Sequence, residues 1–234
     1  MKFETKDCLE LTEDELQAMI DLCEAASEPV AQEFLTSEKE RWVLVSQSYE
    51  NDRLKGFSFF TLDRIGGTPS IVTGFGCVAC YSKRRTVMRG LTAEQFKRAL
   101  ISFPEEDVLV GACFQEADCY EVFWKLEDIV PRPGYDPNGE DRAWGTRLAK
   151  RFGVEDSAYS RRDFRIKGCS ETAPVWRYTD ATAKKNGSQK SSPKENGPKE
   201  NGTSDLFSKV KPDRGDSLIV HGWIRKEDLI KFTS

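Results

Sequence analysis

The first part of the chain carries hydrophobic residues at helical spacing, which predicts an amphipathic helix over residues 11–26. Thr12 stands where a helix N-cap is expected, and Glu15 follows at the capping-box position. Pro29 breaks or restarts the helix, and Val30 to Leu35 predict a short second one. The residues expected on the buried face of the first helix are Leu16, Met19, Ile20 and Cys23.

From residue 41 the hydrophobic period changes to that of β-strands. Residues 42–49 (WVLVSQSY) and 56–62 (GFSFFTL) are rich in β-branched and aromatic residues, and the polar stretch between them predicts a turn. A second turn at 65–69 (IGGTP) leads into a strand over 70–80 (SIVTGFGCVAC), where glycines allow close approach to the backbone. Three consecutive antiparallel strands are therefore expected.

The next segments predict a crossover between parallel strands. A basic turn over 81–90 (YSKRRTVMRG) precedes a helix over 91–103, and residues 107–114 (DVLVGACF) have the continuous apolar pattern of a buried strand. We expect this strand to lie parallel to residues 71–80 through a right-handed crossover. A further helix is predicted over 117–126.

The C-terminal third has weaker signals. Residues 143–153 (AWGTRLAKRFG) predict a short helix, 163–168 (DFRIKG) a short strand, and 217–223 (SLIVHGW) a last strand. Residues 184–202 hold no apolar residue, a composition typical of disorder. The expected organisation is one domain, with an α/β core at residues 1–183, a disordered polar insertion at 184–204, and a C-terminal segment at 205–234 whose strand returns to the core.

The composition excludes several classes of protein. The 234 residues are 38% hydrophobic, enough for one packed core, and contain no apolar run near eighteen residues. The N-terminus carries acids where a signal peptide needs a basic and then an apolar region, so a cytoplasmic location without membrane association is expected. A net charge of −4 argues against general nucleic-acid binding.

Seven cysteines, an odd number scattered through predicted helices and strands, indicate reduced thiols. Cys77 and Cys80 form a CxxC pair, which has the spacing of a zinc or redox site, but no second pair follows. The only histidine, His221, lies far away in the sequence. Buried core cysteines are therefore favoured over metal or thiol chemistry, and no metal is expected.

The order of strand 70–80, basic turn, helix, buried strand 107–114 and aromatic segment 120–126 (YEVFWKL) resembles the GCN5-related N-acetyltransferase (GNAT) family. Residues 11–128 match this family in order and approximate length. The resemblance implies a mixed α/β fold, with a mixed central sheet flanked by helices, and a divergent member of the superfamily. It also implies that acetyl-CoA or another acyl-CoA is the cofactor.

A coenzyme A diphosphate needs backbone N–H groups at a helix N-terminus together with cationic side chains. The family places these in a turn with an Arg or Gln and two glycines, and residues 85–90 (RTVMRG) match its outer positions, with Met88 where the middle glycine would be. The alternative is a solvated basic loop. The resemblance assigns cofactor binding to Val78, Ala79, Cys80, Arg84, Arg85, Arg89, Gly90 and Leu91, with the first three contacting the pantetheine arm through their backbone.

Many family members carry a tyrosine on the following helix that protonates the leaving thiolate. Phe123 occupies the corresponding position here, and Tyr120 lies three residues earlier. Tyr120 is either a substitute acid or, as we favour, part of an aromatic core. His221 is expected to be structural rather than catalytic. The sequence selects no general base among its candidates, which are Glu33, Glu38, Glu40 and Glu116.

These observations predict an acyl-CoA-dependent N-acyltransferase, acting on an amine of a small molecule or peptide, or a divergent relative that has lost the reaction. The competing hypothesis is a non-catalytic interaction module with the same fold, because a fold does not determine a function. The sequence gives no oligomeric state and does not identify the acyl acceptor.

Overall fold

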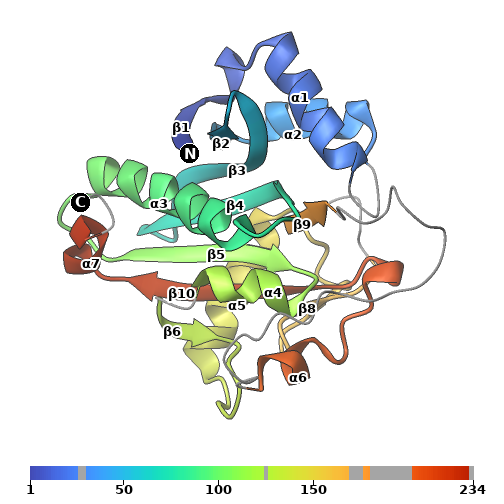
Figure 1. Ribbon diagram of the computed structural model, residues 1–234. Helices are drawn as coiled ribbons and strands as arrows, with labels where there is room; N and C mark the ends of the chain where they lie inside the picture. The colour runs from blue at the N-terminus through green and yellow to red at the C-terminus, as the bar shows by residue number, and fades with distance from the viewer. Residues whose placement is uncertain (26–29, 124–125, 169–175, 180–201, 232–234) are drawn as a thin grey trace.

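A mixed ten-stranded sheet runs through the computed structural model (Figure 1), which describes residues 1–25, 30–123, 126–168, 176–179 and 202–231. The strand order is β1-β2-β3-β4-β5-β10-β8-β7, with β6 paired to β10 and β9 paired to β4 beside this path. The described strands are β1 (Lys2–Asp7), β2 (Leu44–Glu50), β3 (Arg53–Ile65), β4 (Thr68–Ala79), β5 (Val108–Phe114), β6 (Glu127–Val130), β7 (Tyr159–Ser160), β8 (Arg165–Ile166), β9 (Trp176–Thr179) and β10 (Ser217–Ile224).

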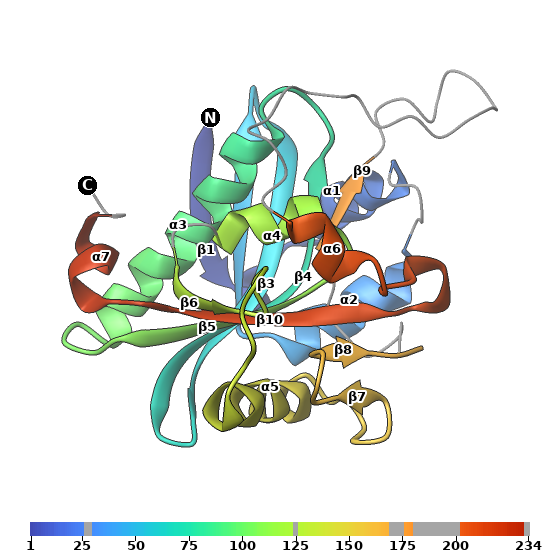
Figure 2. The same ribbon diagram turned by 90° about the horizontal axis from the view of Figure 1, so that it is seen from below.

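Helices cover both faces of the sheet (Figure 2). The described helices are α1 (Glu13–Glu24), α2 (Gln32–Arg41), α3 (Arg84–Ser102), α4 (Ala117–Tyr120), α5 (Gly139–Arg151), α6 (Thr203–Phe207) and α7 (Lys226–Lys231). One apolar cluster joins α3 and α7 to the sheet, and a second joins α1, α2 and α5 to its other face. The mixed α/β fold class expected from the sequence is therefore confirmed.

The N-terminal helices follow the local sequence signals. Thr12 accepts a hydrogen bond from the Glu15 amide, and Glu15 accepts one from the Thr12 amide, so the expected capping box is present. The residues expected on the inner face of α1 are buried. The second helix, α2, begins at Gln32 and extends to Arg41, well beyond the expected short element.

The strands β2, β3 and β4 form the expected antiparallel meander. Asn51 and Asp52 turn the chain between β2 and β3, both with positive φ, and Gly66 and Gly67 turn it between β3 and β4. β1, which the sequence pattern does not predict, adds to the free edge of β2. Because β1 is short and only partly buried, its hydrophobic alternation is too weak to stand out.

The strand β5 lies parallel to β4 across α3, as predicted. The prediction of a basic turn over residues 81–90 is wrong, because α3 begins at Arg84. Val87 and Met88, which the sequence analysis placed in that turn, are buried in the core beneath α3. Their apolar side chains therefore continue the helical face that Leu91 and Phe96 form further along.

The C-terminal strand returns to the middle of the sheet. β10 pairs antiparallel with the whole of β5 through its residues 218–224, and β8 pairs with the beginning of β10. The helix expected over residues 117–126 is shorter, consisting of α4 and a 3-10 turn at Glu121–Phe123. The predicted disordered insertion lies outside the described residues up to position 201, and its last two residues, Thr203 and Ser204, begin α6.

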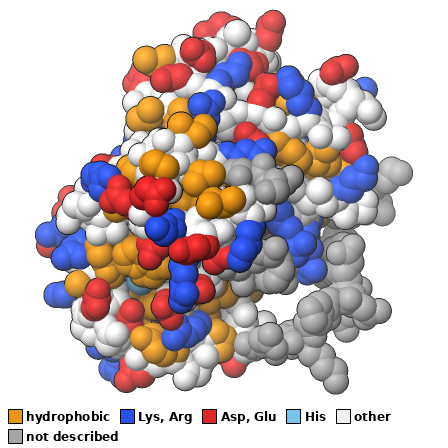
Figure 3. All heavy atoms as spheres, turned by 90° about the vertical axis from the view of Figure 1, so that its left-hand side faces the viewer, with side chains coloured by type: hydrophobic (Ala, Val, Ile, Leu, Met, Phe, Trp, Pro, Cys, Tyr) orange, Lys and Arg blue, Asp and Glu red, His pale blue; other side chains and the backbone are white. Residues whose placement is uncertain are grey.

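Charges of both signs alternate on the end of the molecule that carries α7 (Figure 3). Ion pairs include Arg64 with Glu106, 2.5 Å apart, and Lys226 with Glu105, 3.3 Å apart. None of the described helices combines the length and the apolar composition needed to cross a bilayer.

Candidate functional site

The two parallel strands β4 and β5 separate along their length and form a fork. They pair only at Ser70–Val72 of β4, against Leu109–Gly111 of β5. Beyond the fork, the same edge of β4 pairs with a different strand: Gly76–Ala79 lie in parallel register with β9. The opposite edge of β4 is paired with β3. Both edges of the end of β4 are therefore occupied by strands of this chain.

A β-bulge lies at the point where the fork opens. On β4, Gly74 and Phe75 stand opposite one residue of β3, because Thr73 pairs with Phe60 and Gly76 pairs with Ser58. A bulge bends the strand that carries it and increases its twist. The bulge thus accounts for the departure of β4 from β5 at this point.

Trp42 and Glu38 of α2 fit against the bulge. A Cβ added at Gly74 would lie 2.3 Å from Cε2 of Trp42, so only glycine allows the indole ring to approach this closely. The indole nitrogen of Trp42 donates to Oε2 of Glu38 at 2.8 Å, and the Phe75 amide also donates to the Glu38 carboxylate. The backbone amide that the bulge frees from the strand ladder is therefore satisfied by a buried carboxylate.

The Glu38 side chain is 4% exposed, and its Oε1 lies 3.5 Å from Nη1 of Arg41. Burial raises the pKa of its carboxyl above the ordinary value, although the hydrogen bond from Trp42 and the charge of Arg41 act in the opposite direction. Because its oxygens already accept hydrogen bonds from the indole and from the bulge, we assign Glu38 a positioning role at the bulge.

Cationic side chains gather at the end of the sheet where the fork opens onto α3. Arg84 and Arg85 lie in the first turn of the helix, and Lys83 immediately precedes it. Nζ of Lys83 lies 2.5 Å from Oε1 of Glu50 at the end of β2. Lys55 of β3, which is not among the predicted site residues, places its ammonium 5.6 Å from the centre of the Tyr81 ring. A helix N-terminus with such cations favours an anion.

The structure brings together some, but not all, of the residues expected to bind a cofactor. Val78 and Ala79 end β4, and Cys80 follows them into the turn before Arg84 and Arg85. The other three lie further along, inside α3: Arg89 is exposed one turn beyond Arg85, Gly90 packs against β1, and Leu91 is buried.

The role of Gly90 follows from its neighbour across the helix–sheet interface. A Cβ at this position would lie 2.1 Å from the ring of Phe3 on β1. Gly56 of β3 is similar, because its Cβ would lie 2.7 Å from Cγ1 of Val87. These glycines let α3 pack closely on the sheet, so the glycine in RTVMRG has a packing reason that is independent of any phosphate.

Solved structures of acetyltransferases resemble this one. One is the ribosomal-protein-S18-alanine N-acetyltransferase of Escherichia coli, with 14% identity over 59% of this chain and 86% of that chain and a TM-score of 0.41. Another is aminoglycoside 6'-acetyltransferase type Ii, with 14% identity over 57% of this chain and 88% of that chain and a TM-score of 0.41. A third is an acetyltransferase of the GNAT family from Streptococcus pneumoniae, with 11% identity over 57% of this chain and 91% of that chain and a TM-score of 0.37. No protein-family model and no curated protein matches the chain.

The order of the elements, from α1 and α2 through the antiparallel meander and the α3 crossover to the final antiparallel strand, is the order that the sequence resemblance implied. The chain thus has a mixed α/β fold whose elements follow that predicted order. The resemblance in fold leaves the activity and the acyl acceptor open.

Within this fold, Phe123 and Tyr120 are both part of the core. Phe123 is buried and packs edge-to-face on Phe114, with ring centres 5.2 Å apart. The Tyr120 hydroxyl donates to the carbonyl of Pro131 at 2.9 Å, and its ring meets Phe207 of α6. Burial raises the pKa of Tyr120 to about 12. The interpretation of these residues as aromatic core packing is the one that their contacts support.

Replacing Tyr120 with phenylalanine removes this hydrogen bond and keeps the ring. We expect the free energy of unfolding to fall by about 1 kcal/mol, measured by urea denaturation, because the Pro131 carbonyl loses its buried donor. Any acyl transfer rate should stay unchanged. A loss of turnover with unchanged substrate binding would instead show that Tyr120 supplies the proton to the leaving group.

The remaining candidates for acid–base or metal chemistry are dispersed. Glu33, Glu40 and Glu116 are exposed. His221 is buried on β10, where its Nε2 lies 3.3 Å from the Asp141 carbonyl, and desolvation lowers its pKa to about 4. Cys77 is buried and Cys80 is half-buried. Among the described residues, no three acidic, cysteine or histidine side chains cluster as metal ligands.

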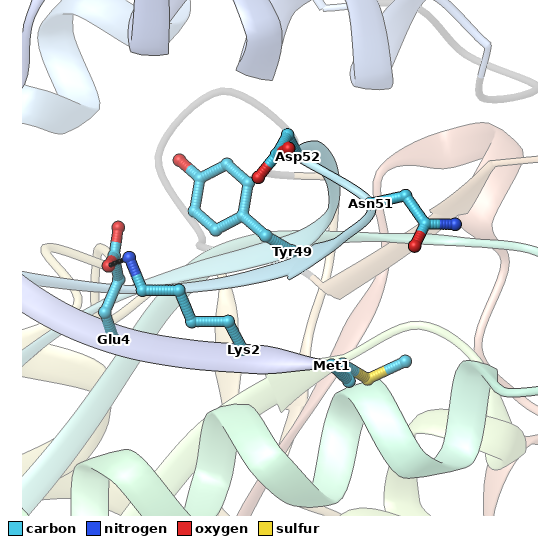
Figure 4. Close-up of a pocket in the computed structure, with 6 residues that line it drawn as sticks. All are labelled: Met1, Lys2, Glu4, Tyr49, Asn51 and Asp52. Carbon is cyan, nitrogen blue, oxygen red and sulfur yellow. Dashed lines mark ion pairs between the residues drawn. The ribbon is translucent and has the colours of Figure 1, made fainter.

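A surface hollow of about 480 Å³ lies beside the β2–β3 turn (Figure 4). Its lining comes from the ends of β1 and β2 and from the turn: Met1, Lys2, Glu4, Tyr49, Asn51 and Asp52. Lys2 and Glu4, two residues apart on β1, form an ion pair on its β1 side. The hollow takes no residue from β4, β5 or α3, so it is separate from the fork.

Proposed function

We propose that this protein binds an acyl-CoA at the fork between β4 and β5 and transfers the acyl group to an amine of a small molecule or peptide. The observation that carries this proposal is the fork itself, with the N-terminus of α3 and its cations at the open end. Backbone N–H groups and arginines there suit a diphosphate. The edge of β4 from Val78 to Cys80 suits the amides of a pantetheine arm.

The reaction requires direct attack. The amine nitrogen attacks the thioester carbon, a C–N bond forms, and the C–S bond breaks. The amine gives up a proton, and coenzyme A leaves as a thiolate that takes up a proton. Backbone donors of β4 near the bulge would polarise the thioester carbonyl. Neither Phe123 nor the bonded Tyr120 offers a ready proton, so the thiolate would be protonated by water.

The second candidate function is a non-catalytic interaction module. The specific observation that favours it is the pairing of β9 along Gly76–Ala79, because this strand takes the edge that a pantetheine arm would need. The two candidates differ in whether acyl-CoA binds at all.

Calorimetric titration with acetyl-CoA tests the proposed site. Arg85 and Arg89 lie four residues apart on one face of α3, and changing both to alanine is expected to weaken binding about tenfold or more, since charge-assisted hydrogen bonds to the diphosphate are lost. A matched control changes Arg161 and Arg162, two exposed arginines in the β7–β8 connection, to alanine.

The control variant loses the same charge and should bind like the wild type. Equal weakening in both double variants would show a non-specific charge effect and contradict the placement of the phosphates. Absence of heat at high micromolar acetyl-CoA, both from the full chain and from a variant in which residues 176–179 no longer pair with β4, would contradict acyl-CoA binding.

A further inference from the structure

The strand β9 lies where a cofactor would have to pair. Its four residues run parallel to the end of β4, with Trp176 opposite Gly76 and Thr179 opposite Ala79. β9 lies beside the end of β4 (Figure 1) and also contacts α1. The paired residues of β4 include Val78 and Ala79, two of the three residues of the proposed pantetheine edge.

A strand edge has one row of backbone donors and acceptors, and it can pair with one partner at a time. Along β4, β3 occupies one edge of Gly76 and Val78, so only the edge on the β5 side remains for a ligand. β5 leaves that edge after Val72, and β9 takes it from Gly76 onward. A pantetheine arm and β9 therefore compete for the same backbone groups.

We infer that β9 is a built-in competitor of the cofactor: an autoinhibitory strand that closes the fork and must leave β4 before acyl-CoA can bind. The inference rests on the proposed function, since it requires an acyl-CoA ligand at the fork. Among the described strands, β9 pairs only with β4, through four residues. It is separated from α6 by more than twenty residues of sequence.

This attachment distinguishes β9 from the other strands of the sheet. β3 is held by long pairings on both of its edges, and β5 by a long pairing with β10 and a short one with β4. β9 instead extends the edge of one strand, as a peptide does when it adds to a sheet. Its release would break only the β4–β9 ladder and would leave the β3–β4 and β5–β10 ladders in place. The fraction of molecules with ligand at the fork would then depend on how strongly β9 and the ligand each bind the edge of β4.

A disulfide can lock this strand with a single substitution. Arg177 stands in register with the native Cys77 on β4, and paired residues of adjacent strands lie within the Cα separation that a disulfide spans. The Arg177→Cys variant is oxidised, the 77–177 bond is verified by peptide mass mapping, and acetyl-CoA binding is measured by calorimetry before and after reduction. The matched control is Arg177→Ser.

The oxidised Arg177→Cys protein is expected to give no measurable heat with acetyl-CoA, and reduction should restore the affinity of Arg177→Ser.

Conversely, Arg177→Pro and Tyr178→Pro each place a proline in β9. Because only one of these two neighbouring residues directs its N–H group towards β4, one of the two substitutions removes a backbone donor from the β4–β9 ladder. If β9 closes the fork in nine molecules of ten, its release tightens binding about tenfold. Gln189→Pro, a proline outside β9, serves as the control and should leave the affinity unchanged.

Three outcomes separate the two proposals. Loss of binding on locking, together with tighter binding in either proline variant, supports the inference. Equal acetyl-CoA affinity in the locked, reduced, proline and wild-type proteins would overturn the inference while leaving the proposed function standing. Failure of every variant, in both redox states, to bind acetyl-CoA would overturn the proposed function and with it the competition.

Discussion

The Gly74→Ala variant is expected to lose about 2–3 kcal/mol of unfolding free energy, because the new methyl group overpacks a buried site and disturbs a buried hydrogen bond. The added Cβ would lie 2.3 Å from Cε2 of Trp42. Trp42 is 3% exposed, and its indole donates to the buried Glu38, so the ring cannot move without leaving that carboxylate short of a donor. Guanidinium denaturation followed by circular dichroism measures the effect.

Gly139→Ala is the matched control. Gly139 begins α5, and a Cβ there would meet no atom within 4 Å, so this substitution should be neutral or stabilising by up to about 1 kcal/mol. A loss at Gly74 no larger than the change at Gly139 would contradict the close packing of Trp42 on the bulge.

A double-mutant cycle identifies the contact responsible. Trp42→Phe removes the part of the ring that lies against Gly74, so the double variant should lose less stability than the sum of the single ones, by about 1 kcal/mol or more. Simple additivity would mean that the methyl group at Gly74 strains the backbone of the bulge rather than the indole. The Gly74→Ala variant also alters the candidate site, since the bulge lies where the fork opens.

Local signals in the sequence were sufficient for much of this fold. The capping box of Thr12 and Glu15, the alternation in residues 42–62 and the glycine turn at Gly66 each depend on neighbours within a few residues, and each is present in the structure. The parallel pairing of β4 with β5 was also predictable, because the crossover rule restricts the topology that a strand, helix and strand can adopt.

The errors at the candidate site have non-local causes. The start of α3 at Arg84 depends on burying Val87 and Met88 against the sheet, and Gly90 is required by Phe3 on a strand more than eighty residues away. In the sequence, the same arginines and glycine suggested a phosphate-binding turn. A short motif therefore could not distinguish a glycine needed for helix packing from one needed for a ligand.

The pairing of β9 and the burial of Glu38 had no signal in the sequence. Residues 176–179 (WRYT) are too few for a periodic pattern, and their partner strand ends almost a hundred positions earlier. Glu38 is buried because Trp42 and the Phe75 amide converge on it, a coincidence that arises only when α2 packs on the bulge. Both features lie at the fork, where the function is proposed.

His221 is expected to make the protein lose stability in mild acid. Desolvation lowers its pKa from 6.5 to about 4 in the folded state, so the unfolded chain binds the proton more readily. Its contribution is therefore fully present above about pH 6.5 and is lost as the pH falls towards 4. At 1.36 kcal/mol for each pKa unit, the loss reaches about 3 kcal/mol.

The His221→Gln variant isolates this contribution. The glutamine amide can still donate to the Asp141 carbonyl, which Nε2 of His221 approaches at 3.3 Å, but it has no proton to gain. We expect similar stability of the two proteins at pH 7.5 and a smaller loss for the variant at pH 4.5, both measured by urea denaturation.

Glu38, whose pKa is raised, changes the stability in the opposite direction over this pH range. It is common to both proteins, so its effect cancels in the difference between them. Equal losses in wild type and variant would show that His221 takes up its proton without unfolding the protein, and that the core around β10 accommodates the charge.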